Sequence, residues 1–395
     1  MPTPKSEEYK FTNLTKILEK QFSSFSKGAA SINRSVVEKL QIEDLNVHKL
    51  VFVNGAFSPS LSDAESLNRV TITTTAEAIE NNNEVFLENF GKASKSNDDE
   101  FLQLNTALTE DGAFIQIGKN AVVEKPIALY FINDSSSEAV YSSGRNLIIA
   151  NENCEVTFLE YYLTEGEEDS FSNVTTEILV DQYAKVNLYK LKNNKDSAYH
   201  VGTTQVHQSR SSVFSSYTFT LNGAIVRNNL NVASDGEGCE THMFGLYVVD
   251  GKTHVDNHTA VDHIQPNSYS NELYKGILDD TAKGVFNGKV YVRQEAQKTN
   301  AFQSNKNILM SDTAVVNTKP QLEIWADDVK CSHGCTTGQL DMDALFYLRA
   351  RGLSKDSARA LLLYAFAIEV IENVQLEPLR KYLEKQISDR LHNEF

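Results

Sequence analysis

The sequence predicts a mainly β protein, with a strand-rich core between a mixed N-terminal segment and a helical C-terminal domain. Short β-branched and aromatic runs recur from about residue 100 to 330, and almost no amphipathic helix interrupts them. After about residue 339 the apolar residues change to helical spacing. We therefore place the N-terminal segment at residues 1–95, the β core at 96–338 and the helical domain at 339–395.

The N-terminal segment combines helical and extended signals. Leu14, Ile17, Leu18 and Phe22 fall on one stripe of a predicted helix over residues 13–22. Residues 50–57 are typical of a strand that breaks into a turn at Asn54-Gly55.

The core repeats one texture, with predicted strands at residues 127–132, 156–162, 186–189 and 213–221. In the last run, Val213, Tyr217, Phe219 and Leu221 alternate with other residues close to period two. Many short strands without helices fit a sandwich, a barrel, a propeller or a β-helix, and neither a blade motif nor a clean repeat period is visible. Single Asn and Gly residues at strand ends favour a β-helix, because both tolerate left-handed backbone conformations at corners.

The C-terminal domain contains three predicted helices. Asp341 can cap a first helix that ends near Arg351, with Gly352 just past its end. Ser354 can cap the second, and the third starts near Pro378. Their apolar stripes require a surface to cover, which is either the β core or a partner protein.

Composition restricts the classes of partner. The chain has 395 residues with 37 lysines and arginines against 53 acids, a net charge of −16 that disfavours nucleic acids and anionic membranes. No apolar run reaches the roughly 18–20 residues of a membrane span, and no secretory signal is visible at the start. Four cysteines in so long a chain indicate a reducing compartment, so we expect a cytoplasmic protein.

The sharpest chemical pattern is Cys331, His333 and Cys335 in residues 327–335, Asp-Asp-Val-Lys-Cys-Ser-His-Gly-Cys. On an extended strand these three residues share one face, with about 7 Å between alternate residues. Thiolate and imidazole suit iron, zinc and iron–sulfur clusters, but one strand rarely supplies a whole site. The three residues either form an incomplete ligand set that a second subunit completes, or are two buried small hydrophobes and a locally bonded histidine.

A second group contains histidines and acids whose strand parity could place some of them together. His254, Asp256 and His258 could face one way, which allows a metal site, an acid–base pair, a polar ladder or a subunit contact. The whole group is Glu240, His242, His254, Asp256, His258 and His263.

Motifs for catalysis are missing. Gly91-Lys92 lacks the upstream glycine of a P-loop, because Phe86 stands there, and Ala93 replaces the required Ser or Thr. Neither G-x-G-x-x-G after a strand nor G-x-S-x-G occurs. We therefore expect no enzymatic activity of these kinds, although 53 acids leave a paired-carboxylate site open.

Several segments resemble SufD, a family that pairs with SufB in the SufBCD complex of iron–sulfur cluster assembly. The densest similarity covers residues 284–292, 318–324, 326–334 and 345–352, and weaker similarity reaches residues 7–14, 52–55 and 104–108. The most specific part is Lys330-Cys331-Ser332-His333-Gly334. SufB carries a cysteine before a strand that corresponds to residues 308–312, whereas residues 304–307 here contain none.

The resemblance implies a right-handed parallel β-helix with helical segments at both ends. It further implies a non-catalytic scaffold that pairs with SufB through a β-helix edge and docks the SufC ATPase on the C-terminal helices. His333 and Cys331 would contribute to a transient iron–sulfur cluster shared with SufB, with none tightly bound by the isolated chain. Cys335 stands where the family pattern has alanine, which leaves two roles open, a chance third thiol or an extra metal ligand.

Two other functions remain as alternatives. One is a polysaccharide-active β-helix enzyme, which would be secreted and carry paired carboxylates in a groove. The other is a purely structural interaction protein whose cysteines and His333 only pack. An isolated chain could also pair with itself through the same strand edges.

Overall fold

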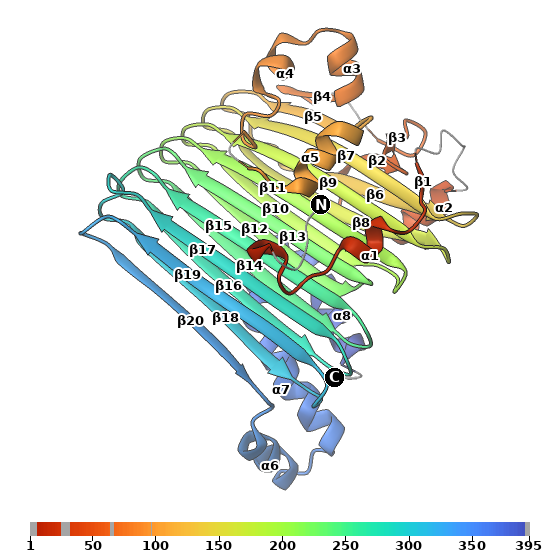
Figure 1. Cartoon of the computed structure of the whole chain (residues 1–395), viewed down its shortest axis with the longest axis vertical. Helices are drawn as coiled ribbons and strands as arrows, with labels where there is room; N and C mark the ends of the chain where they lie inside the picture. The colour runs from red at the N-terminus through yellow and green to blue at the C-terminus, as the bar shows by residue number, and fades with distance from the viewer. Residues whose placement is uncertain (1–5, 25–31, 64–66, 96, 392–395) are drawn as a thin grey trace.

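The computed structural model describes residues 6–24, 32–63, 67–95 and 97–391. Its strands coil into a parallel β-helix made of two long sheets (Figure 1). The short N-terminal helices lie toward its first coils, and the C-terminal helices lie against the outer face of one sheet. The predicted mainly β fold and the parallel β-helix are confirmed.

From β5 onward, odd-numbered and even-numbered strands form separate sheets, because the chain crosses from one sheet to the other after each strand. All pairs are parallel apart from β2–β3 and β4–β5. The first sheet contains β4 (Val70–Thr74), β5 (Ala113–Ile117), β7 (Val140–Ala150), β9 (Ser170–Val180), β11 (Ala198–Gln208), β13 (Ile225–Ser234), β15 (His254–His263), β17 (Lys283–Val292) and β19 (Val315–Ile324), with β1 (Ser23–Ser24) beside β7. The second contains β3 (Ala56–Phe57), β2 (His48–Val53), β6 (Ile127–Ser135), β8 (Glu155–Gly166), β10 (Lys185–Asn193), β12 (Val213–Asn222), β14 (Glu240–Val249), β16 (Tyr269–Leu278), β18 (Asn300–Leu309) and β20 (Lys330–Gly338).

The coils differ in length. Along the second sheet, each strand begins 27 to 31 residues after the strand that it pairs with, at Glu155, Lys185, Val213, Glu240, Tyr269, Asn300 and Lys330. A repeat is therefore present in space although no fixed period is present in the sequence.

The corners use the residues that tolerate left-handed backbone conformations. Asn153, Asn267 and Asp280 turn corners with φ of 56°, 63° and 51°. Asn54 and Gly55, with φ of 51° and 87°, form the turn of the β2–β3 hairpin, as the sequence predicts.

The second sheet is apolar on its outer face as well as toward the interior. Tyr217 stacks between Tyr189 and Phe244, with ring centroids 4.5 and 5.2 Å away, on the face that α7 and α8 cover. Residues 216, 218 and 220, which alternate with this column, are buried Ser and Thr on the inner side of the strand. The outer apolar column thus explains why the C-terminal helices pack where they do.

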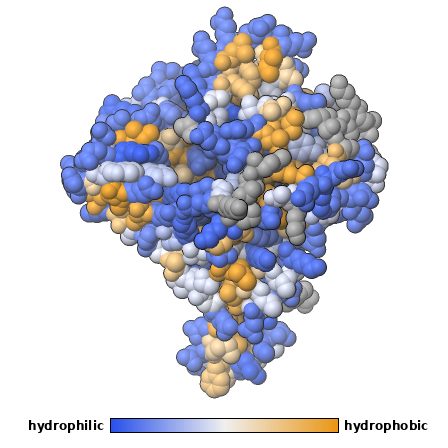
Figure 2. All heavy atoms as spheres, in the orientation of Figure 1, coloured by the Kyte–Doolittle hydropathy of each residue, from blue (hydrophilic) through white to orange (hydrophobic). Residues whose placement is uncertain are grey.

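The C-terminal domain contains α6 (Met342–Ala350), α7 (Lys355–Ile371) and α8 (Glu377–Arg390). Asp341 and Ser354 cap the first two helices by accepting backbone N–H groups, as predicted, and Gly352 follows α6 with φ of 100°. Whereas α7 and α8 lie on the second sheet, α6 projects from the body and exposes hydrophobic side chains (Figures 1 and 2).

The N-terminal part contains a 3₁₀ turn, η1 (Glu7–Tyr9), and short helices α1 (Thr15–Leu18), α2 (Arg34–Lys39), α3 (Thr75–Glu80), α4 (Glu84–Asn89) and α5 (Glu100–Leu108). The helix predicted over residues 13–22 shortens to α1, but Leu14 and Ile17 of its stripe are buried against Phe101 and Tyr141. None of the helices in the described part of the chain is long and apolar enough to cross a membrane.

Candidate functional site

Strand β20, which carries the predicted ligands, is the last strand of its sheet. Its neighbour on one side is β18, and no strand in the described part of the chain pairs with its other edge. Strand β19 ends the other sheet in the same way. We call the outer edges of β19 and β20, together with the inner faces that they leave uncovered, the open end of the β-helix.

The ladder fixes which way the predicted ligands face. Cys331, His333 and Cys335 pair with Ala301, Gln303 and Asn305 of β18, which are at most 3% exposed. The residues between those three on β18 are partly or largely exposed. Because paired residues of parallel strands point to the same side of a sheet, the two cysteines and the histidine face the interior of the β-helix at its open end.

Exposure differs along this row. Cys331 is half-buried and packs beside Val290, Val292 and Ala301, and this burial raises the pKa of its thiol. His333 and Cys335 are exposed, because no further coil lies over them. Burial therefore disfavours the thiolate form of Cys331 in the isolated chain.

This row does not form a complete metal site. Within residues 6–24, 32–63, 67–95 and 97–391, no three His, Cys, Asp or Glu side chains converge as a metal site requires. Alternate residues of a strand lie about 7 Å apart, which is too far for two of them to bind one ion without rearrangement. The row thus places two thiols and an imidazole at a surface that another protein can reach.

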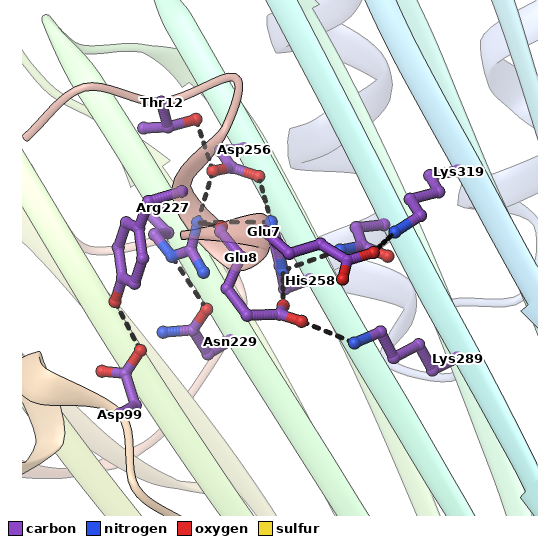
Figure 3. A network of polar contacts seen from close by, with 12 residues as sticks. Glu7, Glu8, Thr12, Asp99, Arg227, Asn229, Asp256, His258, Lys289 and Lys319 are labelled. Atoms are coloured by element: carbon purple, nitrogen blue, oxygen red, sulfur yellow. Dashed lines mark hydrogen bonds and ion pairs between the residues drawn. The ribbon is translucent and has the colours of Figure 1, made fainter. Parts of the chain in front are cut away.

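The second predicted group divides among three places. His254, Asp256 and His258 share the outer face of β15, where they contact the N-terminal segment (Figure 3). His263 is buried and contacts the Ser270 hydroxyl at 2.9 Å, and desolvation lowers its pKa to about 4. Glu240 and His242 lie 3.8 Å apart on β14, in the other sheet.

The N-terminal segment is held on this face by a network of charges (Figure 3). The Arg227 guanidinium lies 2.7 Å from Asp256 and donates to the backbone oxygen of Glu8 at 2.9 Å. The Glu8 carboxylate pairs with Lys289 at 2.5 Å and with His258 at 3.1 Å, while Glu7 pairs with Lys319 on β19.

The charges of this network shift the pKa values of their partners. The hydrogen bond that His258 donates to Glu8, together with the charge of Lys289, lowers the pKa of Glu8 to about 2. Buried Asp256 raises the pKa of His258 despite the desolvation of that ring. A cavity of about 410 Å³ lies beside these residues, and apart from Lys10 the acids and bases that line it pair with each other. We therefore assign this group to attachment of the N-terminal segment and not to a metal site.

Two buried residues behind β20 were missed at the sequence level. Gln303 on β18 pairs in register with His333, and Glu272 on β16 pairs in register with Gln303. The Gln303 amide donates a hydrogen bond to the Glu272 carboxyl at 2.7 Å. The signal that could have found them is their spacing, because Glu272, Gln303 and His333 follow one another at intervals of one coil of roughly 30 residues. This spacing becomes informative once the strand registers are known.

Comparison with known proteins matches nearly the whole chain to one family. Residues 131–366 match the SufBD core domain of the SUF system for FeS cluster assembly, and residues 1–129 match the SufBD N-terminal region. A SufBD family protein of iron–sulfur cluster assembly from Synechocystis is 32% identical, over 99% of this chain and 87% of the relative.

Two further relatives are named as the iron–sulfur cluster assembly protein SufD. The protein from Escherichia coli is 30% identical, over 99% of this chain and 89% of its own. The protein from Bacillus subtilis is 27% identical, over 97% and 89%. This chain therefore belongs to the SufBD family of iron–sulfur cluster assembly proteins.

Proposed function

We propose that this chain is a SufD-type scaffold subunit that pairs with SufB through the open end of its β-helix. The main support is the unpaired outer edge of β20, where an exposed strand presents backbone donors and acceptors for another strand. Apolar residues lie exposed around the same end, among them Phe302, Val315 and Trp325. An edge with both features suits a lasting protein partner.

In this proposal, His333 and Cys331 bind iron that is the cargo of assembly. Their imidazole and thiol are suitable ligands, and the remaining ligands come from the partner that covers the open end. Cys335, one coil beyond Asn305, is a candidate third ligand on the same row. A shared site accounts for an incomplete set on this chain, and for ligands that face inward yet remain accessible.

The SufC ATPase docks, in the same proposal, on the C-terminal helices. Helix α6 projects from the body and exposes Met342, Phe346 and Tyr347 at 66%, 73% and 58% (Figure 2). Side chains of this kind in one short helix suit insertion into an apolar groove. The four thiols are free, which suits a reducing compartment such as the cytoplasm.

The test is cluster formation by the reconstituted complex after His333→Ala. We expect the variant to fold and assemble, because His333 is exposed, and to lose most of the cluster yield. His242→Ala, which changes a histidine on the outer face of β14, is the matched control and should keep the full yield. An unchanged yield in His333→Ala would remove this residue from the chemistry and favour a scaffold that acts by contact alone.

A further inference from the structure

Two buried polar side chains lie behind His333 in the interior of the β-helix. Gln303 and Glu272 lie on the inner face of the second sheet at 3% and 2% exposure. The strand registers align Glu272 with Gln303, and Gln303 with His333. A polar row thus leads from the buried core to the one position of the open end that carries an imidazole.

The Gln303 amide is held by a hydrogen bond to Glu272. Its Nε2 donates to the Glu272 carboxyl at 2.7 Å, and burial raises the pKa of that carboxyl to about 7. A carboxyl oxygen can accept this bond in the ionised and in the neutral form. Gly288 on the facing strand β17 leaves room for the amide, since a Cβ there would lie 2.3 Å from Gln303 Nε2.

The other end of the amide is unsatisfied. Gln303 Oε1 is buried and accepts no hydrogen bond from the described residues. A buried acceptor without a partner costs about 1–3 kcal/mol, so such atoms in native proteins usually await a specific donor. The next side chain along the row is that of His333, which can supply a ring N–H.

We infer that Gln303, held in place by Glu272, accepts the ring N–H of His333 and so directs the other ring nitrogen toward the metal. The inference rests on the proposed function, in which His333 is an iron ligand. Metal-binding histidines commonly donate their second N–H to an oxygen, which fixes the tautomer and the ring orientation. Gln303 and Glu272 are thus positioning residues, and the ion that they prepare His333 for is a divalent metal such as Fe²⁺.

The first test detects the contact without any metal. In the full chain with ¹⁵N-labelled histidine, a hydrogen-bonded ring N–H exchanges slowly with water and gives a cross-peak, which His333→Gln assigns by removing it. We expect this peak in the wild type and its loss in Gln303→Leu. The exchanged pair Glu272→Gln/Gln303→Glu should retain it, because an acceptor oxygen still faces the ring. Ser304→Leu, one residue away on the outer side of β18, should leave it unchanged.

The second test measures Fe²⁺ affinity of the complex with the SufB-type partner. Gln303→Leu should weaken binding roughly 10–100-fold, and the exchanged pair should restore it. Thermal unfolding of each variant checks that the interior still packs. Absence of the His333 peak in the wild type, or a peak that survives Gln303→Leu, would overturn the inference even if His333 binds iron. Conversely, unchanged iron binding in His333→Ala would refute the proposed function and leave the contact itself intact.

Discussion

The Arg227–Asp256 pair predicts a large effect of removing one buried charge. Arg227 and Asp256 lie on neighbouring strands, their side chains are 2% and 1% exposed, and Nη1 is 2.7 Å from the carboxylate. Asp256 also accepts from Thr12 at 2.5 Å and lies 2.9 Å from His258. Arg227→Met keeps most of the side-chain volume beneath Tyr9 but leaves the carboxylate without its guanidinium.

The magnitude follows from burial. Breaking a buried ion pair by removing one partner costs about 3–5 kcal/mol. Because Thr12 and His258 still contact the Asp256 carboxylate, we expect a loss toward the lower end of that range in the free energy of unfolding. The same sheet provides a matched control in Arg293 and Asp262, also 2.7 Å apart but 42% and 28% exposed. Water screens that pair, so Arg293→Met should cost less than about 1 kcal/mol.

Urea unfolding followed by circular dichroism measures both variants. The double variant Arg227→Met/Asp256→Asn should recover much of the loss, because the penalty belongs to the unpaired carboxylate and not to the missing contact. Equal effects of Arg227→Met and Arg293→Met would refute the assignment of the cost to desolvation.

Three further predictions concern the N-terminal segment, the interior and the C-terminal helices. The lowered pKa of Glu8 stabilises attachment of the N-terminal segment above pH 4.5, and this contribution is lost as pH falls toward about 2, whereas the raised pKa of His258 contributes stability below pH 6.5 that is lost at higher pH. Protection of the amides of residues 6–14, measured as hydrogen exchange relative to the intrinsic rate at each pH, should therefore be greatest between about pH 4.5 and 6.5, and His258→Gln should remove the alkaline change. Gly288→Ala should destabilise the chain by about 1–3 kcal/mol through its clash with Gln303, while Gly334→Ala, with nothing within 4 Å, should leave thermal unfolding unchanged. Leu379→Ala, which truncates a fully buried side chain of α8, should lower the free energy of unfolding by about 2–5 kcal/mol. Phe346→Ala should not alter stability but should weaken co-purification with the ATPase, and full retention would exclude α6 from that contact.

The sequence predicted local features well. Asn54-Gly55, Asp341 and Ser354 act through neighbours within a few residues, so their turn and caps are readable from short segments. The apolar stripe of residues 13–22 was also correct, although the helix itself is only four residues long. Burial of Leu14 and Ile17 requires the stripe and not the full helix.

The repeat was hidden by variation in both length and chemistry. Coils differ by several residues, so no single period aligns them. One interior row of the second sheet reads Glu160, Lys190, Thr218, Gly245, Tyr274 and Asn305, which share no residue type. Residues that are adjacent within this row instead complement each other, as where Lys190 lies 3.2 Å from Glu160.

Contacts between distant segments were beyond local reasoning. Glu8 pairs with Lys289 across 281 positions, and nothing near either residue indicates the other. Cys331, His333 and Cys335 were placed on one face by strand parity, and the register with β18 adds that this face is the inner one. In the proposed function the row binds metal only together with a second protein, which neither parity nor register includes.

The most direct test of the shared site is an anaerobic titration of the chain with iron and sulfide, with and without the SufB-type partner. We predict a cluster absorption band only when both proteins are present, and its loss in the Cys331→Ala/His333→Ala variant. A cluster of equal yield on the isolated chain, or one that persists in that variant complex, would contradict a site completed across the open end.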